Sequence, residues 1–374
     1  PITMPNTLKR EWPFFLCLIT AVTIISTPGI LTEWTARGWI AGTLFLITLS
    51  AIFRVTHHAD ELAEMLGEPY GTLILTMSAT IIEVAIMITV LGHNENNPTF
   101  VRDTIAATVM ITVGLMLGLA MFIGAFVHRQ QTVNTEGALT YLGLIVPLAI
   151  LALILPNFTD TTIGPTLALA QEVFIAIVSI VLYGIFLFIQ TRRHRQMFKD
   201  RSAPEPLTFD AGGAVRKHKR AYSRKELWTS IAWLIGNLFL VVFLAEELAV
   251  LIDDQLEAKN LPEALGGLCV ALLILAPECL ASVNAALHNR LQRSVNIALG
   301  SGLATLSLSV PAILLAATLM GHQLILGLPN NQMVMMLATL WVANIALATE
   351  RTNLMQGTVL LVLFLTFGFL IVVP

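Results

Sequence analysis

About eleven apolar stretches follow one another along this chain, and most are long enough, at roughly 18 residues or more, to cross a bilayer as a helix. Apolar residues make up 56% of the chain and charged residues only 12%, whereas soluble domains carry about 25% charged residues. The sequence therefore predicts an all-α polytopic membrane protein. The predicted spans lie near 13–31, 38–56, 71–92, 104–127, 138–156, 166–190, 228–251, 264–287, 296–320, 332–349 and 355–373.

The first apolar stretch follows Lys9 and Arg10 and superficially resembles a secretory signal peptide. It is long for the apolar region of such a peptide, and no small-residue cleavage site follows it. We therefore predict that it forms the first membrane helix. The second helix is expected to continue beyond 38–56 as an amphipathic extension through His57–Met65.

The distribution of basic residues orients these helices, because the cytoplasmic loops of membrane proteins carry an excess of Lys and Arg. If the N-terminus is cytoplasmic, all but three of the 21 Lys and Arg residues lie on the cytoplasmic side. The exceptions are Arg37, Arg102 and Lys259. The opposite orientation would invert this distribution, so we predict a cytoplasmic N-terminus.

One long polar segment, 191–227, interrupts the apolar pattern. It is rich in Lys and Arg and contains Pro204, Pro206 and the pair Gly212-Gly213, which predicts a mobile cytoplasmic loop. A basic loop beside a membrane could bind anionic lipid, or it could simply enforce the orientation of the helices.

This loop divides the chain into a predicted N-terminal helix in 1–35, five helices in 36–190, and five more in 228–374. Because five is odd, the second group enters the membrane from the side opposite to the first. The sequence therefore predicts two inverted-topology five-helix repeats, an arrangement typical of secondary transporters.

Two glutamates lie in the middle of long apolar stretches. Glu83 lies within Gly71–Asn94 and Glu278 within Gly266–Asn289, each twelve residues after a Gly. At about 1.5 Å per helical residue, both fall near the centre of a bilayer core about 30 Å thick. A carboxylate at that depth costs about 2.5–3.5 kcal/mol on insertion scales and usually marks a functional site. The pair predicts a cation site at the interface of the repeats.

Such a pair could bind either metal cations or protons. Ca²⁺ takes about six to eight oxygen ligands, and two carboxylates supply up to about four of them. Burial and a neighbouring like charge both favour the protonated form of a carboxyl group. Protons and cations would then compete for Glu83 and Glu278, which is the chemical basis of antiport. Alternatively, each Glu pairs with a basic residue and only holds helices together.

Several neighbouring oxygens could complete such a site. Pro277 removes a backbone donor and can free the carbonyl group of Leu273. Thr80 is close to Glu83 in sequence, and Ser282 is one helical turn beyond Glu278 on the same face. Two further spans are rich in hydroxyl groups, for which close helix packing is the alternative role. These residues are Thr104, Thr108, Thr112, Ser301, Thr305, Ser307 and Ser309.

A second pair of acids lies before the two central ones. Glu61 belongs to Ala-Asp-Glu-Leu-Ala and Glu247 to Ala-Glu-Glu-Leu-Ala. In the predicted topology, Glu61 lies at the cytoplasmic end of the second helix and Glu247 towards the outer end of the seventh. The two acids could act as gates or proton relays, or they could be merely solvated.

Other chemistries have little support in the sequence. No GxxxxGK[ST] motif and no GxGxxG motif is present, so coupling to a nucleotide is not indicated. The three cysteines fall inside predicted spans without metal-binding spacing and are expected to be buried apolar residues. A membrane hydrolase with Ser301 as nucleophile and His322 as base is a weak alternative.

Three segments of the chain resemble the cation/proton exchanger (CAX) family of the calcium/cation antiporter superfamily, and especially its bacterial sodium-potassium/proton and calcium/proton members. They read HHADELAEMLGEPYGTLILTMSATIIEVAIMI at His57–Ile88, LAPECLASVNAAL at Leu275–Leu287, and LQRSVNIALGSGLATLSLSVP at Leu291–Pro311. The resemblance implies one extra helix followed by two inverted repeats. It also implies that Glu83 and Glu278 alternately bind cation and proton while the helices that carry Glu61 and Glu247 slide.

The chain departs from the family in its amide groups. Eukaryotic members usually have Gly-Asn-Ala-(Thr/Ala)-Glu at both central sites, whereas Glu83 follows Ala-Thr-Ile-Ile and Glu278 follows Ile-Leu-Ala-Pro. Members with a high calcium preference often have a Gln where this chain has Ala304. These departures leave room for Na⁺ or K⁺ as the transported ion.

The resemblance implies a secondary antiporter, not an enzyme, that moves Ca²⁺, and also Na⁺ or K⁺, out of the cell against proton entry. It implies no cofactor and no nucleotide or nucleic-acid partner. A basic loop replaces the acidic helix of eukaryotic exchangers, which favours a bacterial inner-membrane protein surrounded by lipid. A passive cation channel is the main alternative, and the oligomeric state is left open.

Overall fold

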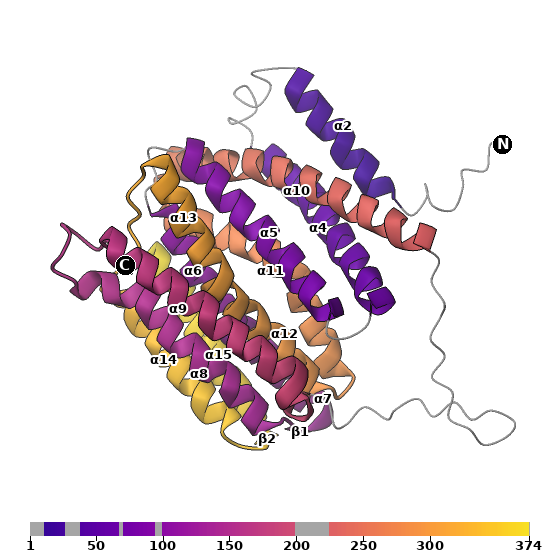
Figure 1. Cartoon of the computed structure of the whole chain (residues 1–374), viewed down its shortest axis with the longest axis vertical. Coiled ribbons are helices and arrows are strands. Elements are labelled where there is room, and N and C mark those ends of the chain that lie inside the picture. Colours follow the sequence, from indigo (N-terminus) through magenta and orange to yellow (C-terminus); the bar gives the residue numbers. More distant parts are fainter. Residues whose placement is uncertain (1–10, 27–37, 67–69, 94–98, 199–223, 374) are drawn as a thin grey trace, which may run out of the picture.

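The computed structural model describes residues 11–26, 38–66, 70–93, 99–198 and 224–373, which are almost entirely helical (Figure 1). The α-helices are α2 (Trp12–Ser26), α4 (Gly38–Leu66), α5 (Tyr70–His93), α6 (Phe100–Met110), α7 (Leu117–His128), α8 (Thr135–Ala149), α9 (Leu169–Phe188), α10 (Arg224–Ala258), α11 (Ala264–Leu287), α12 (Leu291–Ala304), α13 (Val310–Met320), α14 (Asn330–Leu347) and α15 (Leu354–Val372). Short π and 3₁₀ segments extend or join them: η1 (Ile111–Met116), η2 (Ile150–Ile154), η3 (Leu155–Phe158), η4 (Ile189–Arg193), η5 (Arg195–Phe198) and η6 (Thr305–Ser309).

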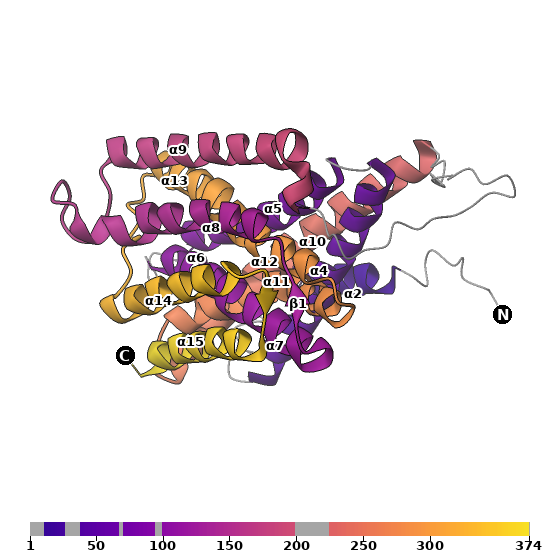
Figure 2. The same cartoon turned by 90° about the horizontal axis from the view of Figure 1, so that it is seen from below.

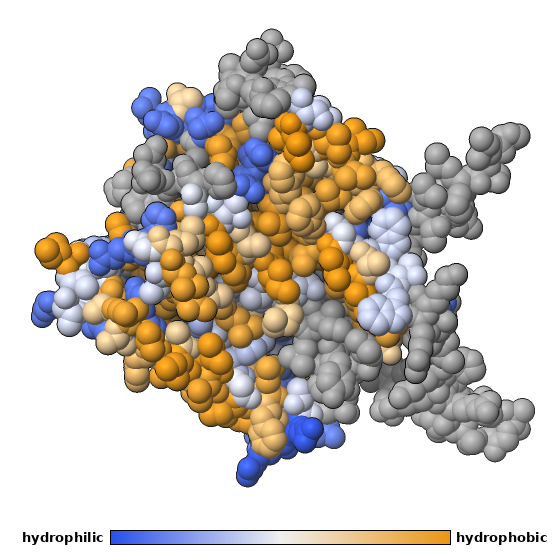
Figure 3. All heavy atoms as spheres, turned by 45° about the horizontal axis from the view of Figure 1, so that its top comes forward, coloured by the Kyte–Doolittle hydropathy of each residue, from blue (hydrophilic) through white to orange (hydrophobic). Residues whose placement is uncertain are grey.

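These elements confirm the predicted all-α membrane class. Eight helical stretches in the described part of the chain are long and apolar enough to cross a bilayer, and Trp12–Ser26 and Met77–Gly92 are shorter apolar helices. The sides of the helices are covered by exposed apolar side chains, seen as broad orange areas in Figure 3, with Phe126, Phe239 and Trp341 each more than two-thirds exposed. A surface this apolar is expected to face lipid.

The helix boundaries differ from the predicted ones mainly at polar ends. The helix predicted at 228–251 begins at Arg224 and ends at Ala258, because hydropathy marks only the apolar middle of a helix that continues into polar sequence. The extension of the second helix through His57–Met65 is confirmed, since α4 continues to Leu66. The end of the first predicted span and most of the basic loop, residues 199–223, lie outside the described residues.

The helices are arranged in two packed regions. Figure 2 shows α8, α9, α14 and α15 gathered on one side and α2, α4 and α10 on the other, with α11 and α12 between them. One buried apolar cluster fills the first region and a second one joins α2, α4, α5 and α10. Three close helix pairs bring together distant parts of the sequence: α4 with α10, α6 with α11, and α7 with α15. The division of the chain into two repeats stays a prediction.

A short pair of strands closes one end of the molecule. β1 (Gln131–Thr132) pairs antiparallel with β2 (Arg351–Thr352), so that the turn after α7 is joined to the turn after α14. Asn134 and Asn353, which follow the strands, accept hydrogen bonds from backbone N–H groups at the start of α8 and α15. These caps fix where two of the membrane helices begin.

Two long helices cross at the middle of the molecule, and each contains a π segment there. The stretch α6–η1–α7 spans Phe100–His128 and the stretch α12–η6–α13 spans Leu291–Met320. They approach so closely that a Cβ atom on Gly302 would lie 2.6 Å from Oγ1 of Thr112. Because π segments in long helices frequently occur at functional sites, this crossing is where we place the candidate site.

Candidate functional site

Glu83 lies on α5 with only 5% of its surface exposed, and three hydroxyl groups donate hydrogen bonds to its carboxylate. Thr108 Oγ1 is 3.3 Å from Oε1. Thr305 Oγ1 is 3.1 Å from Oε1 and 2.9 Å from Oε2. Ser309 Oγ is 2.6 Å from Oε2. Both oxygens of a carboxylate far from water are therefore satisfied by neutral donors, as burial of such a group requires.

The three donors come from different parts of the chain. Thr108 belongs to α6, whereas Thr305 and Ser309 are the first and last residues of η6. Residues four apart lie on the same helical face, so η6 presents both hydroxyl groups to one carboxylate. Glu83 thus receives hydrogen bonds from both predicted halves of the protein.

Glu278 lies on α11 in a different environment. Its Oε2 atom is buried and has no hydrogen-bond partner among the described residues. Ser301 of α12 lies within hydrogen-bonding reach of this carboxyl group, and Glu83 lies within electrostatic range of it. A buried carboxylate oxygen without a partner is costly, so this atom is suited to receive a proton or a cation. No described Lys or Arg contacts either central glutamate, which argues against the structural ion-pair alternative.

The predicted additional oxygen ligands are only partly gathered around these acids. Thr80 is buried on α5. Ser282 and Ser294 exchange side-chain-to-backbone hydrogen bonds of 3.4 and 2.5 Å, which use the Ser282 hydroxyl group to join α11 to α12. Leu273 is buried in the apolar cluster that includes α4 and α10. The roles of all three as ligands stay predictions.

The two outer acids lie apart from the central pair in sequence and in surroundings. Glu61, one-quarter exposed, lies 3.2 Å from His57 and 3.4 Å from His58 on its own helix α4. Glu247 is partly buried on α10. Their proposed roles as gates or relays stay predictions.

The sequence named Thr108, Thr305 and Ser309 only as members of two hydroxyl-rich spans, with oxygen coordination and helix packing as alternative roles. Their signal was the regular four-residue spacing of Thr104, Thr108 and Thr112, and of Ser301, Thr305 and Ser309. That spacing puts each set of hydroxyl groups on one face of a helix. Which face points to a glutamate depends on how the helices cross, which the spacing does not reveal.

The hydrolase alternative is wrong. Ser301 lies in α12, and His322 follows the end of α13 at Met320, after a helical stretch without a break. At about 1.5 Å per residue, nearly 20 residues of helix separate the two side chains by roughly 30 Å. A nucleophile and its base must be within about 3 Å of each other.

Removal of the Ser309 hydroxyl group is expected to change the central site, whereas removal of the nearby Ser307 hydroxyl group is not. Hydrogen bonds to charged groups contribute about 1.5–3 kcal/mol, so Ser309→Ala should change the apparent cation affinity by about tenfold or more. Ser307 is equally buried in η6, but its Oγ has no hydrogen-bond partner among the described residues. Exchange rates measured against cation concentration for both variants check this. Equal effects of the two substitutions would contradict the assignment.

Comparison with known proteins places the chain in a family. The sequence profile of the family described as "Sodium/calcium exchanger protein" matches residues 34–192 and 229–373. The chain is 36% identical over 366 residues to "Putative ionic transporter y4hA" of Sinorhizobium fredii (strain NBRC 101917 / NGR234), covering 97% of this chain and 95% of that protein. It is also 36% identical over 319 residues to "Sodium-potassium/proton antiporter ChaA" of Escherichia coli (strain K12), covering 85% of each.

Solved structures agree on the fold. The structure described as "Structure of native YfkE" superposes with a TM-score of 0.73 at 17% identity, over 96% of this chain and all of that chain. "Crystal Structure of H+/Ca2+ Exchanger CAX" superposes with a TM-score of 0.66 at 15% identity, over 96% of this chain and 91% of that chain.

The comparisons confirm the family resemblance found in the sequence and the prediction of a multi-pass membrane antiporter. The named relatives are transporters, so the prediction that this protein is not an enzyme is also confirmed. The chain belongs to the sodium/calcium exchanger protein family.

Proposed function

We propose that this antiporter exports cytoplasmic Ca²⁺, and also Na⁺ or K⁺, in exchange for external protons, with Glu83 and Glu278 as the shared binding site. The observation that carries the proposal is that Glu83 is buried and that Glu278, which lies within electrostatic range of it, has a buried carboxylate oxygen without a partner among the described residues. Each conformation would expose this pair to one side of the membrane only, so that the proton gradient drives cation export.

Coupling would follow from competition at the carboxylates. Two adjacent carboxylates in a medium of low dielectric constant repel each other, and either a proton or a cation relieves this repulsion. The pair of carboxylates would be least favourable when it holds neither a proton nor a cation. The protein would then rarely change conformation with an empty site. Proton binding on one side and cation binding on the other would then alternate.

The hydroxyl groups around Glu83 could stabilise the site both with and without a bound cation. A hydroxyl group donates one hydrogen bond and offers two acceptor lone pairs. Thr108, Thr305 and Ser309 donate to Glu83 in this structure, and after rotation of the O–H bond each could present its oxygen to a cation. Together with Ser301, they would supply neutral oxygen ligands for a hard cation.

The donor set favours a site of broad selectivity. Among the described residues, no three His, Cys, Asp or Glu side chains converge on a metal site. Two carboxylates with neutral hydroxyl groups can bind Ca²⁺, but the absence of the family amide residues before both glutamates weakens the preference for it. The relative from Escherichia coli is named for sodium, potassium and proton exchange, which supports Na⁺ and K⁺ as additional substrates.

We further propose that the protein lies in a bacterial inner membrane with a cytoplasmic N-terminus. The positive-inside distribution of Lys and Arg supports this orientation. It requires that α4 end and α5 begin at the cytoplasmic face. A cysteine-labelling experiment on residues between helices would check the orientation directly.

Proton movement in everted membrane vesicles tests the proposed exchange. A pH-sensitive dye reports the accumulated protons, and Ca²⁺, Na⁺ and K⁺ are added in turn to vesicles with and without the protein. Release of protons that depends on the protein and on the cation supports antiport, and the order of effective concentrations gives the selectivity. Cation uptake without proton release would support a passive channel and contradict the proposal.

A further inference from the structure

A second cluster of charged side chains lies at the junction of α2, α4 and α10. Glu11, directly before α2, is 2% exposed and forms a two-point ion pair with Arg54 of α4. His58, one turn beyond Arg54, is 1% exposed, and its Nε2 lies 3.2 Å from Oε2 of Glu11. Its Nε2 also lies 3.2 Å from a guanidinium nitrogen of Arg54.

The other ring nitrogen of His58 faces a second carboxylate. Nδ1 lies 3.4 Å from Oε2 of Glu61, but it is buried and makes no hydrogen bond. A neutral imidazole ring has one N–H group, whereas a protonated ring has two. Only the protonated ring can donate to Glu11 and to Glu61 at the same time. Protonation of His58 would therefore let the ring donate to a second carboxylate, whichever nitrogen carries the proton of the neutral ring.

We propose that Glu11, Arg54, His58 and Glu61 form a pH-responsive latch, which tightens when His58 is protonated and which ties the start of α2 to the end of α4. In the predicted topology this latch lies at the cytoplasmic face. It would thus sense the pH of the compartment into which the proposed exchange delivers protons, and it would slow exchange as that compartment becomes acidic.

The groups that face His58 are few and act in opposite directions. Arg54, His57 and Glu61 face the ring from its own helix, α4. Glu11 faces it from the position before α2, and the uncharged Trp233 faces it from α10. No other charged group among the described side chains faces the ring. Burial and Arg54 oppose a proton on His58, and the two carboxylates favour it.

Glu11 itself stays ionised over the range in which a His titrates. Burial alone would raise its pKa, but hydrogen bonds and charges from Arg54 and His58 outweigh burial and lower the pKa below the ordinary value. The stabilisation that Glu11 contributes is therefore present at neutral pH and is lost only in strong acid. Between about pH 5 and 8, the group that changes charge in this cluster is a His.

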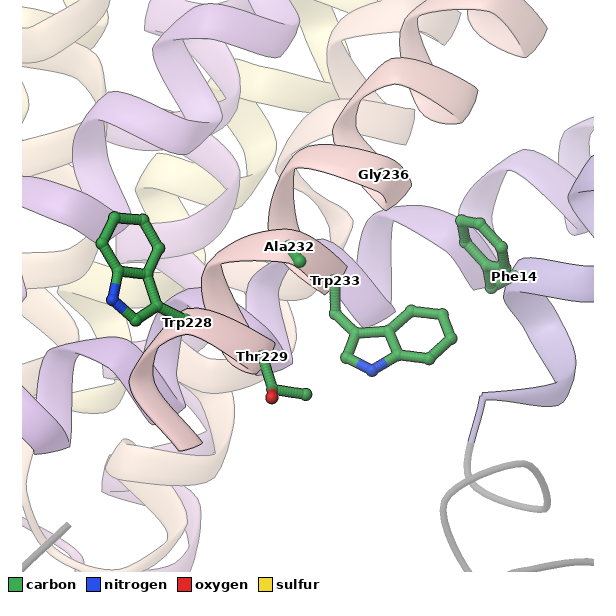
Figure 4. Close-up of a pocket in the computed structure, with 6 residues that line it drawn as sticks. All are labelled: Phe14, Trp228, Thr229, Ala232, Trp233 and Gly236. Carbon is green, nitrogen blue, oxygen red and sulfur yellow. The ribbon is translucent and has the colours of Figure 1, made fainter. Parts of the chain in front are cut away.

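Trp233 links the latch to the packing of three helices. Its ring stacks on His58, with centroids 6.3 Å apart and planes 8° apart, and meets Phe14 of α2 edge-on at 5.1 Å. Phe14 and Trp233 also line an open apolar pocket together with Trp228, Thr229, Ala232 and Gly236 (Figure 4). A proton on His58 would place a positive charge beside this indole ring.

The test uses the fluorescence of Trp233, because a protonated His quenches a stacked indole ring. The full-length protein in detergent is titrated with acid. Because the chain contains 6 Trp residues, the emission of the Trp233→Phe variant is subtracted to isolate the contribution of Trp233. We expect the Trp233 emission to fall as the pH is lowered through the His range, and this change should be lost in His58→Gln. His57→Gln is the matched control, since His57 also contacts Glu61 but is nearly half exposed and does not touch Glu11. An unchanged titration in His58→Gln overturns the proposal.

A second measurement concerns exchange and rests on the proposed function. In everted vesicles the cytoplasmic face meets the bath, so bath pH can be lowered from about 8 to about 5, the range over which a His changes charge. We expect wild-type exchange to fall by about tenfold more than that of His58→Gln, with His57→Gln behaving as wild type. Equal falls in wild type and His58→Gln overturn the regulatory role. If wild type exchanges nothing at any pH, the proposed function fails, and the fluorescence titration still decides whether the latch exists.

Discussion

Glu278→Gln and Glu83→Gln should each reduce cation/proton exchange by about a hundredfold or more. A unit charge about 4 Å from a cation contributes roughly 4 kcal/mol at an effective dielectric constant of about 20, which corresponds to nearly a thousandfold in affinity. Gln has nearly the same shape as Glu, so the loss would reflect charge and proton exchange rather than packing. Proton release on cation addition, in vesicles with matched amounts of protein, measures the effect.

Glu136→Gln is the matched control for these two variants, because Glu136 is an exposed acid in the first turn of α8. It should exchange as wild type does. The thermal unfolding midpoint of each variant in detergent shows whether the fold is intact. Wild-type exchange by both central variants would mean that these acids are structural and that the proposed mechanism is wrong.

Gly357→Ala should strongly destabilise the protein. Gly357 lies where α15 crosses α7, and a Cβ atom there would be 2.4 Å from the backbone N of Phe122 and 2.8 Å from the backbone O of Gly118. Backbone atoms on both sides leave the new methyl group no room, and such overpacking costs about 1–3 kcal/mol or more. This exceeds the gain of about 1 kcal/mol that Ala normally brings to a helix. We expect a fall of several degrees in Tm.

Gly368→Ala provides the comparison on the same helix. A Cβ atom on Gly368 would meet nothing within 4 Å, so the helical preference of Ala should leave Tm unchanged or slightly raised. Thermal unfolding followed by size-exclusion chromatography measures both variants. A similar Tm for the two would show that α7 and α15 do not pack as closely as described.

Much of the fold could be predicted because each helix that spans a bilayer needs about 20 consecutive, mostly apolar residues, whatever the other helices do. Every predicted span that falls on described residues corresponds to a helical stretch, from α2 to α15. The extension of α4 followed in the same way from its amphipathic pattern. Helix ends were less accurate, as α10 shows, since hydropathy does not mark where a polar sequence stays helical.

The candidate site could be predicted only in part. A charged residue in the middle of an apolar stretch is conspicuous in any sequence, so Glu83 and Glu278 could be singled out without a structure. Which of the candidate oxygen groups contact the two glutamates could not be predicted. Ser282 was expected beside Glu278 from its helical spacing, yet its hydroxyl group joins α11 to α12. Glu61 of the proposed latch was singled out as a gate or relay, but Glu11 and Arg54 were not, because each is ordinary near the end of a helix until the two are placed against each other.

The sequence by itself determined the membrane class, the succession of helices and the two central acids, because each of these depends on local hydropathy and on the cost of a charge in lipid. Only the tertiary structure decided which hydroxyl groups meet Glu83, that an oxygen of Glu278 is left without a partner, and that Glu11 and His58 are joined. The hydrogen bonds among them link residues from 25 to 226 positions apart. They depend on how helices cross and rotate against one another, and that is set by the packing of all of them together.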